Sequence, residues 1–356
     1  MVATRCFTYN QAPYIEETLR GFALQETSFP VVFIIVDDAS IDGEPNVLRS
    51  WVSENLQYES EKEIWQEMPY GHLSVAPLKE KPQLLFVTLL LAQNHYAIEK
   101  RKKKSEFIKE WECDAKYIAM CEGDDYWIDP KKLQKQVDLL EEHNDYSLCF
   151  TDKLILKGEK KYHDVETNRL LQTVSDFRPI VIDGGYIHLA TLLFRKKMYD
   201  KIPKAFDDNP WLMTDFQMCI ELMHEGGVSY LPEITAVYRK LDSSACHFIN
   251  IEKAIAFQES AYNARSYYCH LYKDMNELQS WVDNYYCNMG LTIACRFHDW
   301  MYIKKYISFA KEKGNLSISF LVKNAYVYII EYPFVVKIRK FLTNKIFKKR
   351  HGLQEV

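Results

Sequence analysis

Three carboxylates are concentrated at the end of one apolar run. Residues 117–121 (Tyr-Ile-Ala-Met-Cys) have the composition of a buried strand, and Glu122, Asp124 and Asp125 follow within four positions. Like charges this close raise one another's pKa, so a cation commonly compensates their repulsion. Carboxylate oxygens are ligands that Mg²⁺ and Mn²⁺ prefer, which makes a divalent metal site the leading interpretation. The alternative is an acid-rich turn with solvated side chains.

The pattern after these acids predicts a helix. Asp129 stands where an N-cap is expected and Pro130 where the first helical residue is expected. Leu133, Val137 and Leu140 then follow with helical spacing. Acids between a buried strand and a helix lie at the carboxyl edge of a sheet, where open α/β sheets bind ligands.

A second acid-rich strand end lies near the N-terminus. Residues 31–36 are continuously apolar, as in a strand buried on both faces, and they stop at Asp37 and Asp38. Residues 2–7 predict an earlier strand. Helical patterns follow both strands, over residues 13–25 and 45–55. This order predicts a βαβ unit and therefore a largely parallel sheet with right-handed crossovers.

The rest of the chain is less regular in pattern. Residues 56–83 look like an insertion or a long loop, and residues 154–186 show no readable chemistry. Short strands are expected at 147–151, 188–195, 228–231 and 236–239. From about residue 249 the pattern is helical and aromatic. We therefore predict an α/β domain over residues 1–248 and a helical C-terminal region over residues 249–356.

Composition narrows the function classes. The 356 residues carry a net charge of −4, which gives no reason to expect nucleic-acid binding. The nine cysteines are scattered without a C-x-x-C pair, and no signal-peptide pattern precedes the first strand. These features predict free thiols in a cytoplasmic protein and argue against a zinc site.

Two basic stretches have two interpretations each. Residues 99–109 form either a solvated helix face or a surface that faces a phosphate. Residues 337–350 contain seven Lys or Arg and no acid, interleaved with large apolar residues. Such a helix lies on anionic membranes, so peripheral contact with the inner face of the membrane is expected there. The alternative is a frayed, solvated tail.

The motifs, taken in order, resemble the family 2 glycosyltransferases, the large inverting group with the GT-A fold. The likeness covers roughly residues 2–245. The matching segments are Thr-Tyr-Asn-Gln at 8–11, Ile-Ile-Val-Asp-Asp-Ala-Ser-Ile-Asp-Gly at 34–43, Glu-Gly-Asp-Asp-Tyr-Trp at 122–127, Thr-Asp at 214–215, Tyr-Leu-Pro-Glu at 230–233 and Ala-Val-Tyr-Arg at 236–239. The resemblance implies an α/β fold of the GT-A type, a Rossmann-like and mostly parallel sheet flanked by helices.

The resemblance also implies roles for individual residues. The base and ribose of a sugar donor would be held by residues of the first two strand ends, namely Thr8, Tyr9, Asn10, Asp37 and Asp38. Glu122-Gly123-Asp124 stands where the family has its D-x-D metal motif, with Glu in place of the first Asp, so the metal is expected on Asp124 and Asp125. Asp215 matches the catalytic base, although Thr214 departs from the acidic or glycine residue common before it. The basic residue that contacts the diphosphate stays unassigned.

By this resemblance the protein is a metal-dependent inverting glycosyltransferase that uses Mn²⁺ or Mg²⁺. The donor is a nucleotide-diphosphate sugar, with a UDP-sugar expected first, and the acceptor is a hydroxyl of a glycan or lipid-linked sugar. The cellular role would be cell-surface polysaccharide or glycolipid biosynthesis. A divalent ion neutralises the departing diphosphate, and an ionised carboxylate accepts the acceptor's proton.

Other functions fit the residues less well. A sugar-phosphate nucleotidyltransferase would need a Gly-rich, basic loop after the first strand, whereas residues 8–11 contain neither glycine nor lysine. A glycoside hydrolase needs two carboxylates but no metal-like cluster. A non-catalytic carbohydrate- or membrane-binding module stays open if the metal site is degenerate.

Overall fold

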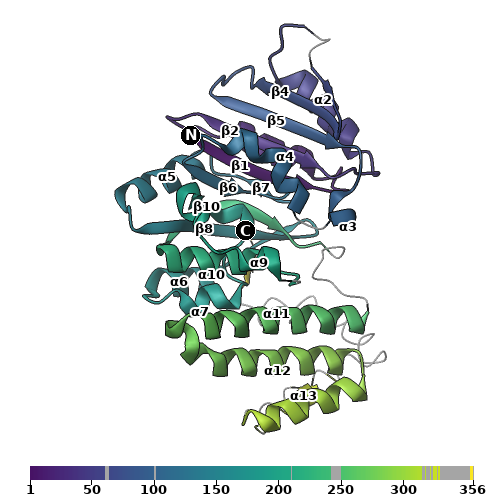
Figure 1. The fold of residues 1–356 in the computed structure, drawn as a ribbon, viewed down its shortest axis with the longest axis vertical. Coiled ribbons are helices and arrows are strands. Elements are labelled where there is room, and N and C mark those ends of the chain that lie inside the picture. The colour runs from purple at the N-terminus through teal and green to yellow at the C-terminus, as the bar shows by residue number, and fades with distance from the viewer. Residues whose placement is uncertain are drawn as a thin grey trace.

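The computed structural model describes residues 1–60, 64–99, 102–209, 211–241, 250–314, 317, 321, 324–326, 328 and 353–355. Figure 1 shows a twisted sheet with helices packed on it and, at one end, a stack of long helices. The basic stretch 337–350 lies outside the described residues.

The centre of the sheet is parallel, as the sequence predicts. Strand β1 (Val2–Thr8) lies between β2 (Val31–Asp37) and β6 (Tyr117–Met120), and β5 (Leu84–Leu91) lies on the other side of β2. All seven residues of β2 are buried, which explains its unbroken apolar composition. Helices α1 (Ile15–Ala23) and α2 (Glu44–Asn55) follow β1 and β2. The predicted βαβ unit is confirmed.

The second half of the sheet is mixed. Strand β10 (Leu192–Arg195) is antiparallel to both β6 and β8 (Tyr146–Lys157), so β8 runs in the same direction as β1. Strand β11 (Gly227–Arg239) is parallel to β8 and also pairs with β7 (Tyr126–Trp127). Helix α10 (Asp215–Glu225) precedes β11 and lies along β8 in Figure 1. Its first residue therefore lies toward the carboxyl edge of the parallel strands.

Two segments predicted to be irregular are ordered. Residues 56–83 contain β4 (Gly71–Pro77), which is antiparallel to β5, and β3 (Gln66–Met68), which is antiparallel to β4. The prediction of a long loop is therefore wrong for these two strands. Of the prolines and the glycine that suggested it, Gly71 and Pro77 stand at the two ends of β4, where a strand tolerates them. Residues 154–186 contain the end of β8 and β9 (Lys160–Asp164), joined in a hairpin, and then two helices, α6 (Val165–Thr173) and α7 (Arg178–Asp183).

Helix α5 (Lys132–Glu142) begins later than predicted. The backbone N–H groups of Ile128 and Asp129 donate to the carbonyl of Thr235, which keeps both residues on the sheet. Pro130 is therefore not helical, and the Asp129 carboxylate accepts from the Lys131 N–H at 2.8 Å ahead of the helix.

One further prediction is wrong in kind: residues 353–355 of the region predicted to be helical form a strand, β12, which pairs antiparallel with β9. Other elements differ from the prediction in their boundaries. The two strands predicted at 228–231 and 236–239 are one strand, β11, with register shifts between Leu231 and Ala236. The strand predicted at 188–195 is a short 3-10 turn, η2 (Leu189–Thr191), followed by β10. The other short elements are α3 (His95–Glu99), α4 (Lys102–Glu112), α8 (Lys196–Tyr199), α9 (Ala205–Asp208), η3 (Lys273–Leu278) and β12 (Leu353–Glu355).

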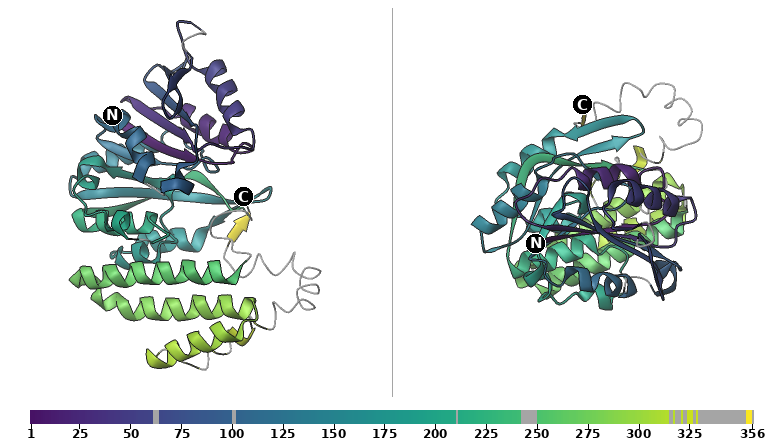
Figure 2. Two further views of the ribbon diagram at one scale, coloured as in Figure 1. Left: turned by 45° about the vertical axis from the view of Figure 1, so that its right-hand side comes forward. Right: turned by 90° about the horizontal axis from the view of Figure 1, so that it is seen from above.

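Three long helices form the C-terminal stack, as the left view in Figure 2 shows. They are α11 (Ile251–Leu271), α12 (Gln279–Arg296) and α13 (Trp300–Glu312). Helix α11 joins the stack to the α/β part, because the Tyr268 hydroxyl donates to Glu221 on α10 at 2.7 Å. Among the helices described, none combines the length and apolarity needed to cross a bilayer. We propose that the α/β domain ends at residue 248 and that the helical C-terminal region begins at residue 249.

Helix α1 packs against the sheet at backbone contact. The ring of Phe22 stacks on Phe33 of β2 and meets Trp127 of β7 edge-on, with centroids 4.8 and 4.9 Å apart. A Cβ on Gly21 would lie 2.7 Å from the Trp127 carbonyl oxygen and 2.8 Å from its backbone nitrogen. Only glycine at this position lets α1 lie this close to β7, next to the acid-rich loop.

We therefore expect Gly21→Ala to destabilise the protein by about 1–3 kcal/mol, the usual cost of overpacking a core. In a helix without this contact the same substitution would stabilise by roughly 0.5–1 kcal/mol. Urea unfolding followed by circular dichroism measures the difference. Ser50→Ala on the exposed side of α2 is the control, and it should change stability little. A Gly21→Ala protein as stable as wild type would contradict the close packing of α1 on β7.

Candidate active site

The loops after β1 and β2 are joined by backbone-to-side-chain hydrogen bonds. Asn10 has a left-handed backbone, with φ 55°, and its N–H donates to the Ser40 hydroxyl at 2.8 Å. Its side-chain carbonyl accepts from the Ile41 N–H at 2.9 Å. The Ala12 N–H donates to Asp42 at 2.9 Å. The two predicted strand ends therefore form one surface, on which the Tyr9 ring is 44% exposed.

A buried carboxylate that the sequence analysis did not single out holds this junction. Glu44, in the first turn of α2, has no exposed surface. It accepts from the Thr8 hydroxyl, from the Gln11 N–H at 2.8 Å and from the Ser40 hydroxyl at 2.9 Å. Burial raises the pKa of Glu44. The Thr8 side chain thus helps to hold the loops after β1 and β2 together.

Asp37 and Asp38 are brought to the same edge, but they have different contacts. The Asp38 carboxylate accepts from the N–H groups of His95 and Tyr96, at 2.8 and 3.1 Å, and so caps α3. Asp37 accepts two longer bonds from the Ser40 N–H, at 3.3 and 3.4 Å. Burial raises the pKa of Asp37 to about 6.

The acid-rich loop after β6 packs directly on the loop after β1. A Cβ on Gly123 would lie less than 3.0 Å from the side chains of Thr8 and Gln11. The Thr18 hydroxyl of α1 bonds the carbonyls of Gly123 and Asp125, at 3.0 and 2.6 Å. The structure therefore brings together all three strand ends that the sequence analysis singled out.

The three acids of this loop lie in different environments. Glu122 is exposed, Asp124 is half-buried and Asp125 is only 2% exposed. One oxygen of Asp125 accepts from the Arg239 N–H at 2.8 Å, and the other lies 3.5 Å from Nδ1 of His188. Burial raises the pKa of both Asp124 and Asp125, and the charge of Asp124 adds to the effect on Asp125. Glu122 is thus open to solvent and Asp124 partly so, whereas Asp125 is turned toward β11.

Basic side chains surround the acids from segments distant in sequence. The Arg239 guanidinium donates to the Asp124 carbonyl at 2.8 Å, pairs with Glu17 and lies 4.6 Å from the Tyr14 ring. The His188 ring lies 4.1 Å from the Tyr238 ring. Arg239 lay inside a recognised motif, but His188 had no sequence signal because its neighbours are apolar.

A half-buried lysine lies near these groups. The ammonium of Lys153 on β8 donates to the Tyr186 carbonyl at 3.3 Å, in the segment that leads to His188. Burial lowers the pKa of Lys153, and the neighbouring acids, Asp125 among them, oppose that effect. Burial and the charge of Lys153 together lower the pKa of His188, so its imidazole is neutral at pH 7. The buried face of the acid-rich loop is therefore lined by basic groups.

Asp215 is the first residue of α10, after Thr214 as the N-cap, and it is half-buried. Burial lowers the pKa of Arg265 on α11, and the negative charge of nearby Asp215 opposes that shift. Arg265 in turn donates to the carbonyls of Ile182 and Asp183, at 2.8 and 2.6 Å. The structure thus places Asp215 beside the segment 182–185, and that segment continues to His188 at the acid cluster.

A pocket opens on this side of α10. It has a volume of about 350 Å³, including space open to solvent, and lies between the 183–185 segment and helices α11 and α12. Its polar lining comes from Asp183, Gln258, Arg265 and Tyr285, and Met213 lines it two residues before Asp215.

The residues present fit a metal only in part. Within the described parts of the chain, no group of three or more His, Cys, Asp or Glu side chains is arranged to hold an ion. Asp124 and Glu122 offer hard oxygen atoms on the outward side of the loop, and oxygens of a bound diphosphate would have to supply the remaining ligands. This is a donor set of the kind that Mg²⁺ shares with substrate phosphates.

Comparison with known proteins gives two kinds of relative. No family model matches the chain. The uncharacterized proteins Rv1520 of Mycobacterium tuberculosis and Mb1547 of Mycobacterium bovis are each 29% identical over 239 residues, which cover 65% of this chain and 57% of the relative. The chain therefore spans little more than half the length of these curated relatives.

The fold is shared with a solved mannosyltransferase structure. The mannosyltransferase PcManGT from Pyrobaculum calidifontis, in complex with GDP-Man and Mn²⁺, is 13% identical, with 95% of this chain and 83% of that chain covered and a TM-score of 0.51. S. aureus TarS 1–349, in complex with UDP-GlcNAc, is 12% identical, with 88% and 92% covered and a TM-score of 0.48. The predicted α/β fold of the GT-A type, with a helical C-terminal region, is confirmed.

The raised pKa of Asp37 predicts a pH dependence of stability. The folded protein holds the Asp37 proton up to about pH 6, whereas the unfolded chain loses it near pH 3.8. The free energy of unfolding should therefore fall as pH rises from about 4 to 6 and stay lower above that. We expect Asp37→Asn to remove about 1–3 kcal/mol of this fall.

Urea unfolding at pH 4.5 and 7.5 tests this expectation. The exposed Asp138 on α5 provides the control variant, Asp138→Asn, which should follow the wild-type pH profile. If the stability of Asp37→Asn depended on pH as that of the wild-type protein does, the fold would not hold the Asp37 carboxyl in its neutral form.

Proposed function

We propose that the protein is a glycosyltransferase that moves a sugar from a nucleotide-diphosphate donor to an acceptor hydroxyl. The observation that carries the proposal is the convergence of three loops, after β1, β2 and β6, at one sheet edge toward which the first residue of α10 also lies. The shared fold with a mannosyltransferase solved with GDP-Man and Mn²⁺ supports it.

The donor nucleotide would lie on the joined loops after β1 and β2. The exposed Tyr9 ring offers a face for the base, and Asn10 is exposed beside it. Of the two aspartates, we assign the ribose contact to Asp37, since its bonds to Ser40 are long, while Asp38 caps α3. A UDP-sugar is the first donor to test, and GDP-sugars are the second.

The diphosphate would lie against the outward side of the acid-rich loop, where Glu122, Gly123 and Asp124 are. A bound Mn²⁺ or Mg²⁺ would neutralise the charge that develops on the departing nucleotide diphosphate. Asp124 would hold it, with Glu122 reaching it directly or through water. For Asp125 we replace the expected role as a ligand by a positioning role, because its carboxylate is buried and accepts from the Arg239 N–H.

Asp215 would be the general base. It opens α10, where the positive end of the helix dipole favours a charged carboxylate, and the Arg265 guanidinium is nearby. An acceptor hydroxyl entering from the pocket beside Met213 would give its proton to Asp215 and attack the anomeric carbon from the side opposite the diphosphate. One such displacement inverts the anomeric configuration.

The acceptor we propose is a glycan or a lipid-linked sugar in cell-surface polysaccharide or glycolipid synthesis. Peripheral membrane contact through residues 337–350 and a cytoplasmic location belong to the same proposal. The second candidate, a sugar-phosphate nucleotidyltransferase, would release pyrophosphate from a nucleoside triphosphate and a sugar phosphate. Two assays separate the two candidate functions. One measures nucleotide diphosphate released from UDP- and GDP-sugars, and the other measures pyrophosphate released from a nucleoside triphosphate and a sugar phosphate.

The two aspartates of the loop should respond differently to the same substitution. Asp124→Asn should lower Mn²⁺-dependent UDP-sugar hydrolysis by roughly 100-fold or more, because it removes a charged metal ligand. Asp125→Asn keeps an oxygen for the Arg239 N–H and should stay within about tenfold of wild type. Calorimetry of UDP binding with Mn²⁺ and with EDTA completes the test. Tight UDP binding that EDTA does not change would exclude the metal from the donor site.

Asp215→Asn should lower the rate of hydrolysis, with water as acceptor, by about 10²–10⁴-fold without changing UDP affinity. Asp299 on α13 provides the control, because its carboxylate caps that helix by accepting from the N–H groups of Met301 and Tyr302. Asp299→Ala should cost about 1 kcal/mol of stability and leave the rate unchanged. If Asp215→Asn turns over donor at the wild-type rate, the base lies elsewhere.

A further inference from the structure

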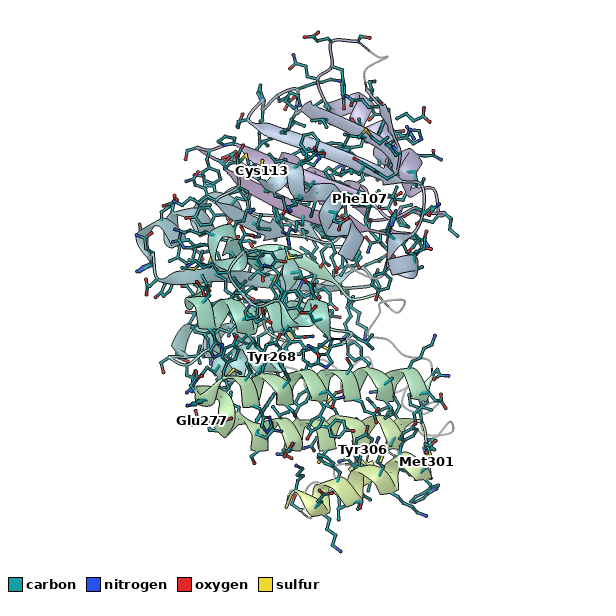
Figure 3. All side chains as sticks on the ribbon, viewed as in Figure 1. Phe107, Cys113, Tyr268, Glu277, Met301 and Tyr306 are labelled. Atoms are coloured by element: carbon teal, nitrogen blue, oxygen red, sulfur yellow. The ribbon has the colours of Figure 1, made fainter. Side chains whose placement is uncertain are left out.

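Helix α13 is amphipathic, with one face on α12 and the other in water. Ile303, Tyr306 and Ala310 are buried on the α12 side, and a Cβ on Gly290 of α12 would collide with the Tyr306 ring. Trp300 and Met301 are 62% and 66% exposed. Figure 3 shows Met301 at the beginning of α13 and Tyr306 between the two helices. Two large apolar side chains therefore stand together at the outer end of the stack.

Lysines share this outer side of α13. Lys304 and Lys311 are exposed and follow Trp300 at helical spacings of four and eleven residues, so all three lie on one face. We call Trp300, Met301, Lys304 and Lys311 the α13 outer face. Of the acids near it, Asp299 is engaged as the cap of α13, and Glu312 lies at the opposite end of the helix. The face is thus both apolar and cationic.

The chain continues from this face into its most basic segment. The Tyr328 ring lies 5.8 Å from the Trp300 ring and 4.5 Å from the His298 ring. Nine residues later the sequence enters the stretch 337–350, with its seven Lys or Arg and no acid. Eight residues join that stretch to Tyr328, and two residues join its other end to β12, which pairs with β9 of the sheet.

We propose that the α13 outer face rests on the surface of an anionic phospholipid bilayer. Trp300 and Met301 would enter the headgroup boundary, and Lys304 and Lys311 would lie along the anionic headgroups. A protein partner would account for Trp300 and Met301, whose types are enriched at protein–protein interfaces, but not for the two lysines, whose type is depleted there. This inference concerns a surface remote from the acid-rich loop and does not depend on the proposed sugar transfer.

Flotation of the full chain with vesicles tests the proposal without any donor sugar. The probes are vesicles of phosphatidylcholine alone and vesicles that also contain about 30% phosphatidylglycerol, which gives them an anionic surface. Wild type should float with the anionic vesicles only. The double variant Trp300→Ser/Met301→Ser should bind them about tenfold more weakly. Lys304→Glu/Lys311→Glu should lose at least about fivefold per lysine.

Matched controls come from elements outside the helical stack. Leu170→Ser removes a 46% exposed apolar residue from α6, and Lys131→Glu/Lys197→Glu reverses two exposed charges near the sheet. Both should float like wild type, and all variants should melt at the wild-type temperature. If both α13 variants floated as the wild-type protein does, the proposal would be wrong, and membrane binding would be assigned to residues 337–350. A dimer in light scattering that Trp300→Ser/Met301→Ser dissociates would overturn it too, and would assign the face to a second copy.

Discussion

Glu44 accepts hydrogen bonds from Thr8, Gln11 and Ser40 while its own carboxylate has no exposed surface. The loops after β1 and β2 depend on this contact, because one buried carboxylate accepts from donors on both of them. An unpaired buried donor costs about 1–3 kcal/mol, and three donors meet at this one side chain. The acid-rich loop depends on it in turn, because Gly123 packs on Thr8 and Gln11. A carboxylate that contacts no proposed substrate thus supports the whole candidate site.

The sequence predicted the elements whose signal is local. Strand β2 could be recognised because it is buried on both faces, so each of its residues is apolar. The β8–β9 hairpin could not, because polar residues such as Asp152 and His163 pair with each other inside it and interrupt the apolar pattern. The start of α5 was misplaced for a related reason, since a bond from Ile128 to Thr235, a residue distant in sequence, outweighs the capping signal of Asp129 and Pro130.

The candidate site shows the same division between local and distant information. That Glu122, Asp124 and Asp125 stand at a strand end is visible in the sequence. Which of them turns inward is decided by the Arg239 N–H, 114 residues away from Asp125. The burial of Glu44 and the placement of His188 are likewise set by packing partners. Residue type and spacing indicated the chemistry of this sheet edge. Tertiary contacts decide which of its acidic side chains are buried and which are open to solvent.

The hydrogen bond between Tyr268 and Glu221 links the helical stack to the helix that begins at Asp215. Glu221 also accepts from the N–H groups of Lys204 and Ala205, so one buried carboxylate satisfies three donors from two other parts of the chain. A substitution at residue 268 therefore changes the environment of α10 as well as that of α11. Over evolutionary time the two parts cannot drift independently, and lineages that alter Tyr268 should carry a compensating change at Glu221 or around residue 204.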